Sequence, residues 1–334
     1  MDINNDLGSE RRGVLEKVLA FRELVLLGFI GLLIVGVGLR SAHFLTAGNF
    51  MDILLDASIL MVMAIAQMMV ILTAGIDLSV ASTLAFSGMA VALLVRDGIV
   101  VNPWLCLLLG MVIGAALGSL NGFLIAKAGM PPIIATIATM TIYRGSTFLI
   151  SDGAWVSAHQ MTDGFKLIAR GTIFGIPNLV LTVIIVALIF YYFLGHTTTG
   201  REIYAVGGNP DAARFVGINV GWIRFLVYML SGFLSGLSGV LWVSRYASAQ
   251  SNTAVGFELL TVAACVIGGV FIFGGSGSIT GVLLGGFLLA TIVNSLAVMR
   301  VNPFWRLAIQ GIIILVAVVV DTIMSRRISK RTGI

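Results

Sequence analysis

Long apolar runs separated by short polar segments occupy most of this chain, and each run is close to the roughly 20 residues that a membrane-crossing helix needs. Hydrophobic residues make up 58% of the sequence and charged residues only 10%, which excludes a soluble domain, because its surface must be polar. The sequence therefore predicts an all-α, polytopic membrane protein with about ten transmembrane helices in one bundle. The predicted spans are residues 24–40, 53–74, 79–95, 104–125, 131–150, 178–195, 223–243, 257–273, 279–297 and 306–324. The pair on either side of Gly75 can also be interpreted as one broken crossing.

Lysine and arginine predict the orientation of the chain, because cytoplasmic loops carry an excess of these residues. With the N-terminus inside, the cytoplasmic segments hold twelve basic residues and the opposite side seven, so both termini are expected in the cytoplasm. The cytoplasmic set is Arg11, Arg12, Lys17, Arg22, Lys127, Arg201, Arg214, Arg224, Arg326, Arg327, Lys330 and Arg331. The opposite set is Arg40, Arg96, Lys166, Arg170, Arg245, Arg300 and Arg306. The predicted organisation is a cytoplasmic segment over 1–23 containing a short interfacial helix, a transmembrane domain over 24–324 with a cytoplasmic loop over 196–222, and a basic cytoplasmic tail over 325–334.

Glycines at four-residue spacing predict close helix packing, because they leave a flat groove along one face of a helix. The span 104–125 contains four of them, and two later spans repeat the pattern. These residues are Gly110, Gly114, Gly118 and Gly122, then Gly232 and Gly236, then Gly281 and Gly285. The spacing favours one tightly packed bundle.

One polar loop, residues 197–220, has helix-capping signals of its own. Asn209 is a suitable N-cap, Pro210 suits the first helical position, Asp211 places negative charge in the first turn, and Gly217 suits a left-handed stop. About two turns of helix fit between cap and stop, and a helix this short needs a surface to lie on. The side chains available for such a contact are Ala212, Ala213, Phe215 and Val216. Two interpretations are open: the helix docks into a partner protein, or it lies on its own membrane domain.

Several other classes of function lack the residues that they need. Cys106 and Cys265 lie inside apolar spans, where a free cysteine behaves as a small hydrophobe, and no Cys/His cluster indicates a metal or other cofactor. The basic residues form no basic face interleaved with aromatic residues, so nucleic acid is not an expected partner.

Two enzymatic interpretations also fail on missing residues. The run Gly236-Leu237-Ser238-Gly239 matches the G-x-S-G of intramembrane serine proteases, but the three histidines lie in loops or at span ends, so helix packing is the favoured explanation. No lysine follows the glycines of a phosphate-binding loop, so an ATP-driven process would need a separate ATPase subunit.

Polar residues within the predicted spans are candidates for a translocation path. Arg144 is the clearest ionisable one, and it is expected either to pair with a carboxylate or carbonyl groups or to extend to the outer interface. The uncharged candidates are Gln67, Asn121, Asn294 and Gln310, which either contact a passing sugar or join helices. Asp77 precedes Ser79 and the next span, and a helix N-cap is its simpler role. Asp56 is the one weak candidate for ion coupling, so an ion-coupled secondary transporter is the alternative hypothesis.

Several motifs together resemble a known family, the inner-membrane permeases of bacterial ABC importers for ribose, xylose, arabinose, galactose, rhamnose, autoinducer-2 and related molecules. The resemblance runs from about Asn49 to Asp321. The matching pieces are Gly75-Ile76-Asp77-Leu78-Ser79-Val80, Asn121-Gly122, Ala135-Thr136, Tyr143-Arg144-Gly145, Thr199-Gly200-Arg201, Tyr204-Ala205-Val206-Gly207-Gly208-Asn209, Ala212-Ala213, Gly217-Ile218, Cys265-Val266-Ile267-Gly268-Gly269 and Gly274-Gly275-Ser276-Gly277.

The resemblance implies an importer subunit that works by alternating access and pairs with a second copy or a sister permease. Two ATPase domains would lie beneath the pair, and a periplasmic sugar-binding protein would dock above it. The resemblance also implies that the polar loop couples the permease to the ATPase, with Asp211 where the general motif has Glu. The residues expected in this coupling role are Gly200, Arg201, Asn209, Asp211, Ala212, Ala213, Phe215 and Gly217. The transported monosaccharide is not specified.

Overall fold

The computed structural model describes residues 23–302 and, beyond them, residues 305, 308, 309, 311, 312, 315 and 319. The predicted interfacial helix before residue 24, the tail over 325–334 and most of the predicted span 306–324, including Gln310, lie outside the described residues. Within the described part, nearly all regular structure is α-helical, and the one sheet is a two-stranded hairpin. The prediction of an all-α, polytopic membrane protein is therefore confirmed.

Seven of the described helices are long and apolar enough to cross a membrane, and two apolar helices are shorter. The long helices are Glu23–Arg40, α2 (Ala47–Leu72), α4 (Pro103–Ala126), α5 (Pro132–Ser151), α7 (Asn178–His196), α10 (Val220–Tyr246) and α12 (Ile279–Val298), and the shorter ones are α3 (Val80–Arg96) and α11 (Phe257–Ile267). The remaining elements are η1 (Ala42–Leu45), η2 (Ala158–Gln160), α6 (Asp163–Arg170), β1 (Thr172–Ile173), β2 (Ile176–Pro177), α8 (Thr198–Gly208) and α9 (Pro210–Phe215). Strands β1 and β2 pair antiparallel, with Thr172 opposite Pro177 and Ile173 opposite Ile176.

The predicted span 257–273 is wrong at its C-terminal end, because α11 stops at Ile267. Its 11 residues measure about 17 Å at the helical rise, about half of a membrane crossing. The helix ends where glycines begin, and Gly269, Gly274 and Gly275 all have positive φ angles, which other residues rarely adopt. The apolar composition hid this break, because hydropathy does not report backbone conformation.

Glycine-mediated packing is confirmed for all three predicted spans. A β-carbon at Gly110 would lie 2.9 Å from the carbonyl oxygen of Gly236, and the backbones of Gly114 and Gly232 approach just as closely. On the other side of the bundle, Gly285 of α12 packs against α11, where its β-carbon would lie 2.9 Å from the Gly268 nitrogen. Side chains at these positions would separate the helices, so the glycines set the spacing of α4 with α10 and of α11 with α12.

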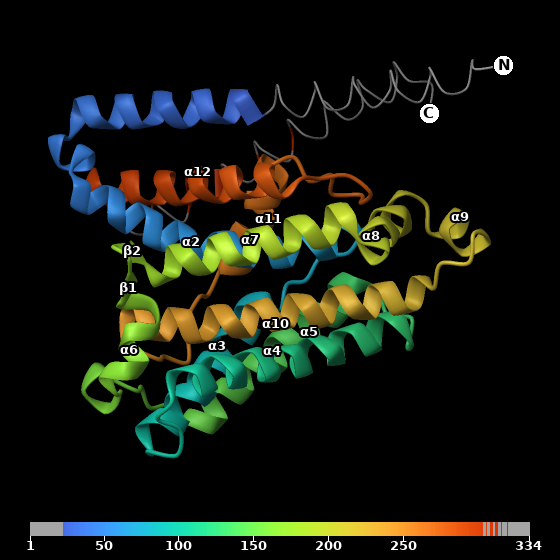
Figure 1. Ribbon diagram of the computed structural model, residues 1–334, viewed down its shortest axis with the longest axis horizontal. Coiled ribbons are helices and arrows are strands. Elements are labelled where there is room, and N and C mark those ends of the chain that lie inside the picture. Colours follow the sequence, from blue (N-terminus) through green and yellow to red (C-terminus); the bar gives the residue numbers. More distant parts are fainter. Residues whose placement is uncertain are drawn as a thin grey trace.

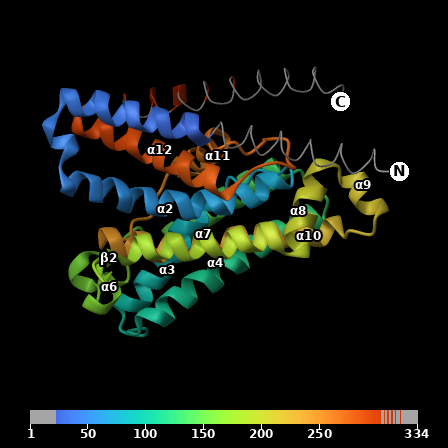
Figure 2. The same ribbon diagram turned by 45° about the horizontal axis from the view of Figure 1, so that its top comes forward.

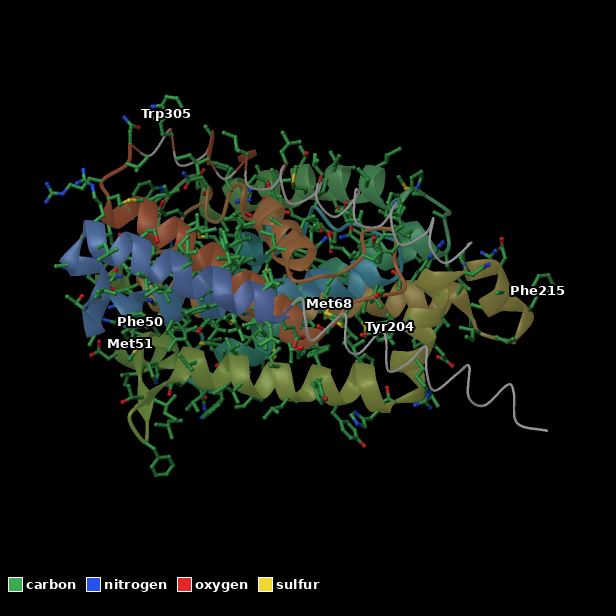
Figure 3. All side chains as sticks on the ribbon, turned by 90° about the horizontal axis from the view of Figure 1, so that it is seen from above. Phe50, Met51, Met68, Tyr204, Phe215 and Trp305 are labelled. Carbon is green, nitrogen blue, oxygen red and sulfur yellow. The ribbon has the colours of Figure 1, made fainter. Side chains whose placement is uncertain are left out.

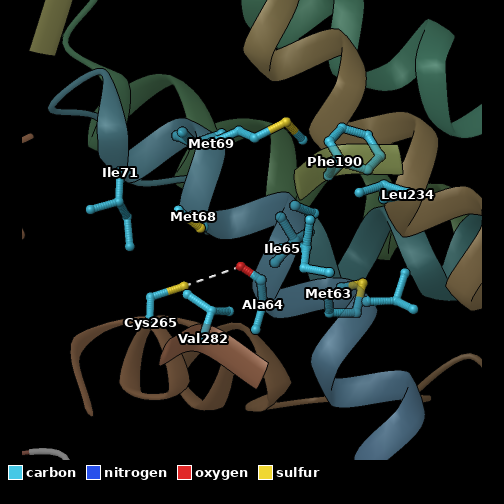
Figure 4. Packing of buried hydrophobic residues seen from close by; sticks show 14 of the residues in the cluster. Met63, Ala64, Ile65, Met68, Met69, Ile71, Phe190, Leu234, Cys265 and Val282 are labelled. Carbon is cyan, nitrogen blue, oxygen red and sulfur yellow. Dashed lines mark hydrogen bonds between the residues drawn. The ribbon is translucent and has the colours of Figure 1, made fainter. Parts of the chain in front are cut away.

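Helix α2 forms the centre of the largest cluster of buried hydrophobic residues (Figure 4). Most of its residues from Ala57 to Leu72 are buried, although α2 is as apolar as a lipid-facing helix. Cys265 of α11 donates its thiol hydrogen to the carbonyl oxygen of Ala64, 3.2 Å away (Figure 4). A helix that is apolar all round is expected to lie at the centre of its bundle.

The two ends of the bundle carry different structures (Figures 1 and 2). One end, here called the α6 end, holds α6 and the β1–β2 hairpin. The opposite end, here called the α9 end, holds α8 and α9, which project beyond the long helices. The capping signals predict a helix at the position of α9, whereas the residues of α8 were predicted to be loop, so α8 is an element that sequence patterns missed.

Candidate functional site

Helix α9 has the cap that its sequence predicts. The Asn209 side-chain oxygen accepts hydrogen bonds from the backbone N–H groups of Asp211 and Ala212, each at 3.0 Å. Arg214 forms an ion pair with Asp211 at 3.0 Å, and Gly217 has a φ angle of 86° just after the helix. These contacts satisfy the orphan donors of the first turn and stop the helix after six residues, slightly less than two turns.

The surface of α9 divides sharply between a buried and an exposed side. Ala213 is buried against the rest of the chain, and its carbonyl oxygen accepts a hydrogen bond from the Ile218 N–H group. Phe215 is 92% exposed and Val216 is 76% exposed, and Figure 3 shows Phe215 at the tip of this end of the molecule. Large apolar side chains this exposed at the end of a bundle are typical of a protein-binding surface.

Helix α8 connects α9 to the bundle. The Thr197 hydroxyl caps α8 by accepting from the Gly200 N–H at 3.0 Å. Gly200 lies directly against the carbonyl groups of Phe193 and Leu194, where a β-carbon would overlap both. Arg201 is exposed beside it. Gly200 therefore permits the sharp corner between α7 and α8. This packing role within the chain does not depend on a partner protein.

The C-terminal end of α8 meets two connections that are far apart in the sequence. These are the α2–α3 connection, residues 73–79, and the α11–α12 connection, residues 268–278. The Gly275 N–H donates to the carbonyl oxygen of Leu72 at 3.0 Å. A β-carbon at Gly207 would overlap that same carbonyl oxygen and would lie 2.6 Å from the Gly275 nitrogen. We call the backbone contacts of Leu72, Ala74, Gly207, Gly274 and Gly275 the glycine junction.

Other contacts strengthen the glycine junction. A β-carbon at Gly274 would lie 2.8 Å from the Ala74 nitrogen and 3.0 Å from the Gly207 carbonyl oxygen. Tyr204 of α8 donates its hydroxyl to the carbonyl oxygen of Gly277 at 3.1 Å, and burial raises the pKa of this hydroxyl to about 12, so it stays protonated. Two of the motifs that carry the family resemblance, the one that begins at Gly75 and the one that begins at Gly274, thus belong to connections that meet at α8.

A buried polar cluster lies just beyond the glycine junction, around Asp77. The Asp77 carboxylate accepts from the Ser79 N–H at 2.9 Å, from the Ser79 hydroxyl at 2.7 Å and from the Ser231 hydroxyl of α10 at 3.2 Å. Asn121 of α4 donates to the Ser79 hydroxyl at 2.7 Å. In the amide orientation that its neighbours require, Gln67 of α2 pairs with the backbone N–H and C=O of Asp77. We call these residues the Asp77 cluster.

The Asp77 cluster joins four segments of the bundle through side chains that are all buried. Ser79, not Asp77, is the N-cap residue of α3, and Asp77 acts on it from outside the helix. A buried carboxylate is stable only when it is hydrogen-bonded, and here three donors reach it. Among the predicted path residues, the structure therefore brings Gln67 and Asn121 together. Ser231 was not predicted, because a lone serine in a glycine-rich helix carries no distinct signal.

Arg144 and Asn294 lie apart from this cluster. The Arg144 guanidinium donates to the carbonyl oxygen of Thr253 at 2.6 Å and to that of Ser251 at 3.4 Å, so it pairs with carbonyl groups, which is one of the two arrangements expected. These contacts attach α5 to the α10–α11 connection. Asn294 is half-buried on α12, and its side-chain oxygen has no partner among the described residues. Asp56 accepts from Tyr246 at 3.0 Å and lies 3.8 Å from Arg245.

These features define a multi-pass membrane protein with a capped, exposed helix at one end that is joined by backbone contacts to the interior of the bundle. Residues 49–318 match the family model for the permease component of branched-chain amino acid transport systems. The chain belongs to this family of transport-system permeases. No solved structure gives a significant match.

Curated relatives match nearly the whole chain. The ribose import permease protein RbsC of Bacillus subtilis is 40% identical over 295 residues, which cover 88% of this chain and 91% of the relative. The D-allose transport system permease protein AlsC of Escherichia coli is 36% identical, with 89% and 91% covered. The L-arabinose transport system permease protein AraH of Escherichia coli is 33% identical, with 87% of each chain covered.

Proposed function

We infer that this chain is the membrane-spanning permease subunit of an ATP-binding-cassette importer that moves a monosaccharide across the bacterial inner membrane. The observation that carries this inference is the similarity to ribose, allose and arabinose permeases over almost the full length of the chain. This similarity favours an ABC importer over an ion-coupled transporter, the alternative that the few membrane carboxylates support only weakly. ATP hydrolysis is then assigned to a separate subunit.

The family description names branched-chain amino acids, whereas the relatives just named transport sugars. We assign a sugar because these sugar-permease relatives cover more of the chain than the family model matches, and do so at 33–40% identity. The chemistry of the bundle agrees with this assignment. A free amino acid is a zwitterion that needs fixed charges of both signs, whereas a sugar needs neutral hydrogen-bonding groups, which predominate in the described spans.

We assign α9 and its flanks to the contact with the ATPase subunit. The exposed Phe215 and Val216 supply apolar anchors, while Asn209, Asp211 and Gly217 fix the shape of the helix. Ala213 seats the helix on the bundle, and the neighbouring Ala212 leaves the exposed side free of bulk. Gly200 and Arg201 lie in the first turns of α8, and we expect α8 to carry a displacement of α9 to the glycine junction, which its C-terminal end contacts.

This assignment orients the molecule in the membrane. The α9 end faces the cytoplasm and the ATPase, and the α6 end faces the periplasm and a sugar-binding protein. A second copy or a sister permease completes the transporter, because two ATPase subunits close on each other and each needs its own contact. Closure moves α9 and α8, and the glycine junction passes that movement to the connections beside the Asp77 cluster. Our candidates for the translocation path stay Gln67, Asn121, Arg144 and Asn294. Two of them are held by hydrogen bonds, Gln67 by the Asp77 backbone and Asn121 by the Ser79 hydroxyl.

The experiment that tests this function is a measurement of ATP hydrolysis by the permease purified with a co-expressed ATPase subunit. Candidate binding proteins are added empty or loaded with ribose, allose, arabinose or leucine. We expect one sugar-loaded binding protein to stimulate hydrolysis severalfold over its empty form. Stimulation by the leucine-loaded form alone would move the assignment to amino acids, and a permease that binds no ATPase would refute the importer assignment.

A further inference from the structure

A small cavity lies at the α9 side of the Asp77 cluster, among segments from four parts of the chain. Its volume is about 90 Å³. Its walls are Thr73, Ala74 and Gly75 of the α2–α3 connection, Ile125 of α4, Pro132 at the start of α5, and Arg224 and Tyr228 of α10. A cavity of this volume has room for several water molecules. The cavity therefore combines an apolar wall, from Ile125 and Pro132, with polar groups of α10.

Tyr228, on the wall of this cavity, carries a hydrogen-bonding group that the protein does not use. Only 1% of this residue is exposed, yet its hydroxyl has no hydrogen-bond partner among the described residues. The Tyr228 hydroxyl lies over Gly75. A β-carbon at Gly75 would be 2.5 Å from the hydroxyl oxygen, so the absence of a side chain at this glycine makes room for the hydroxyl. A buried hydroxyl without a protein partner is rare and costly, so this group is available to a molecule that enters the cavity.

Arg224 supplies donors on the same wall. Its side chain is half-buried, and within the described part of the chain it forms no hydrogen bond or ion pair. A guanidinium, a phenol hydroxyl and a small apolar wall suit a neutral polyhydroxylated ring, which offers hydroxyl groups at its edge and C–H groups on its face.

We propose that this cavity is a sugar-binding subsite near the cytoplasmic end of the path, where Tyr228 and Arg224 hydrogen-bond the hydroxyl groups of the monosaccharide. The proposal rests on the proposed function and adds the place where the sugar is held before release. At about 90 Å³ the cavity is well below the roughly 300 Å³ of a typical ligand pocket, so the proposal requires the cavity to widen before it holds a monosaccharide.

The wall that must move to enlarge the subsite is the wall that the glycine junction holds. Ala74 and Gly75 line the cavity, while the adjacent Leu72 carbonyl is bonded to Gly275 and lies against Gly207 of α8. The Ala74 backbone also contacts Gly274. A displacement of α8 therefore reaches the cavity wall through two backbone contacts, which links ATPase closure to the size of the subsite.

The test measures how sugars protect a cysteine in the cavity wall from a thiol reagent. Ala74→Cys is made in a chain whose buried cysteines are replaced by alanine, and the purified permease–ATPase complex is labelled with a small methanethiosulfonate. D-Ribose, D-allose and L-arabinose are compared with glycerol at equal millimolar concentration. We expect one sugar to slow labelling at least threefold, and we expect Tyr228→Phe or Arg224→Gln to abolish that protection. Tyr191→Phe, on the exposed surface of α7, is the matched control and should leave protection unchanged.

Protection that persists in the Tyr228→Phe, Arg224→Gln double variant, or the absence of protection by every sugar, would overturn the subsite. Thr73→Cys serves as a second reporter on the same wall if Ala74→Cys does not elute as a single species. The assay separates this proposal from the proposed function. Sugar-stimulated ATP hydrolysis without protection rejects the subsite alone, whereas loss of ATPase binding by the unmodified chain rejects the importer.

Discussion

Gly207 is the position where a single methyl group should most strongly disrupt communication between α9 and the bundle. An alanine there would overlap the Leu72 carbonyl oxygen and approach the Gly275 nitrogen to 2.6 Å, and both are backbone atoms that are hydrogen-bonded to each other. Overpacking of this kind costs about 1–3 kcal/mol. Because alanine gains about 1 kcal/mol over glycine inside a helix, the net cost is about 2 kcal/mol at the upper end of that range.

Gly208 provides a matched control one residue further along the same helix. A β-carbon at Gly208 has no neighbouring atom within 4 Å, so Gly208→Ala should be neutral or slightly stabilising. Because both variants gain helix propensity, the difference between them equals the overpacking cost, and about 3 kcal/mol at its upper end corresponds to a factor of about 160 in the population of the native junction. We expect Gly207→Ala to insert in the membrane but to lose most sugar uptake, and Gly208→Ala to resemble the unmodified protein.

The assay pairs sugar uptake by proteoliposomes with ATP hydrolysis and thermal unfolding of the same preparations. For Gly207→Ala we expect a lower unfolding temperature and ATP hydrolysis that no longer responds to the sugar-loaded binding protein. Equal uptake and equal unfolding temperatures for the two alanine variants would refute the role of the glycine junction. A Gly207→Ala protein that unfolds earlier but still transports normally would reduce the junction to a packing contact.

Three further predictions concern separate parts of the site. Phe215→Asp should abolish co-purification of the ATPase subunit in a pull-down. The control is Phe174→Asp, because Phe174 is fully exposed in the hairpin at the α6 end, and this variant should retain the ATPase. Equal retention by both variants would contradict the α9 contact. Ser231→Ala removes a donor to a buried carboxylate and should lower the free energy of unfolding by about 1.5–3 kcal/mol. Ser238→Ala removes a hydroxyl that has no partner among the described residues and should change stability and uptake little. Similar denaturation midpoints for the two variants would argue against the Asp77 cluster. Asn209→Ala removes both cap hydrogen bonds of α9 and should cost about 1 kcal/mol of local stability. The loss should be measurable as faster hydrogen exchange of the Asp211 and Ala212 amides. Unchanged exchange would show that the cap is dispensable.

The sequence was sufficient to predict the helical fold because hydropathy and glycine spacing are local signals. Runs of about 20 apolar residues identified the long helices, and the four-residue glycine spacing identified the closely packed faces of α4, α10 and α12, although not which helices pair. The predicted C-terminal end of α11 was wrong because the sequence stays apolar through Phe271, after the backbone has left the helix at Ile267. Helix α8 was missed because its polar residues and glycines favour a loop, and tertiary contacts of Ile203 and Val206 override that preference.

The candidate site was predictable only in part, for the same reason. The cap of α9 is written in consecutive residues, so Asn209 and Gly217 could be assigned before the fold was known. The glycine junction joins Leu72, Gly207 and Gly275, which lie in three separate parts of the sequence, and no local pattern indicates their contact. Tyr228 likewise stands out only when its burial is seen together with a hydroxyl that has no partner in the part of the chain that the structure describes.

The most direct test of the importer assignment is sugar uptake by proteoliposomes that contain this permease, its ATPase subunit and the binding protein outside. We predict uptake against a gradient that requires ATP inside, requires the binding protein and continues when an ionophore removes the proton and sodium gradients. Uptake that proceeds without ATP and stops when the ionophore is added would contradict the account, and would establish instead the ion-coupled transporter.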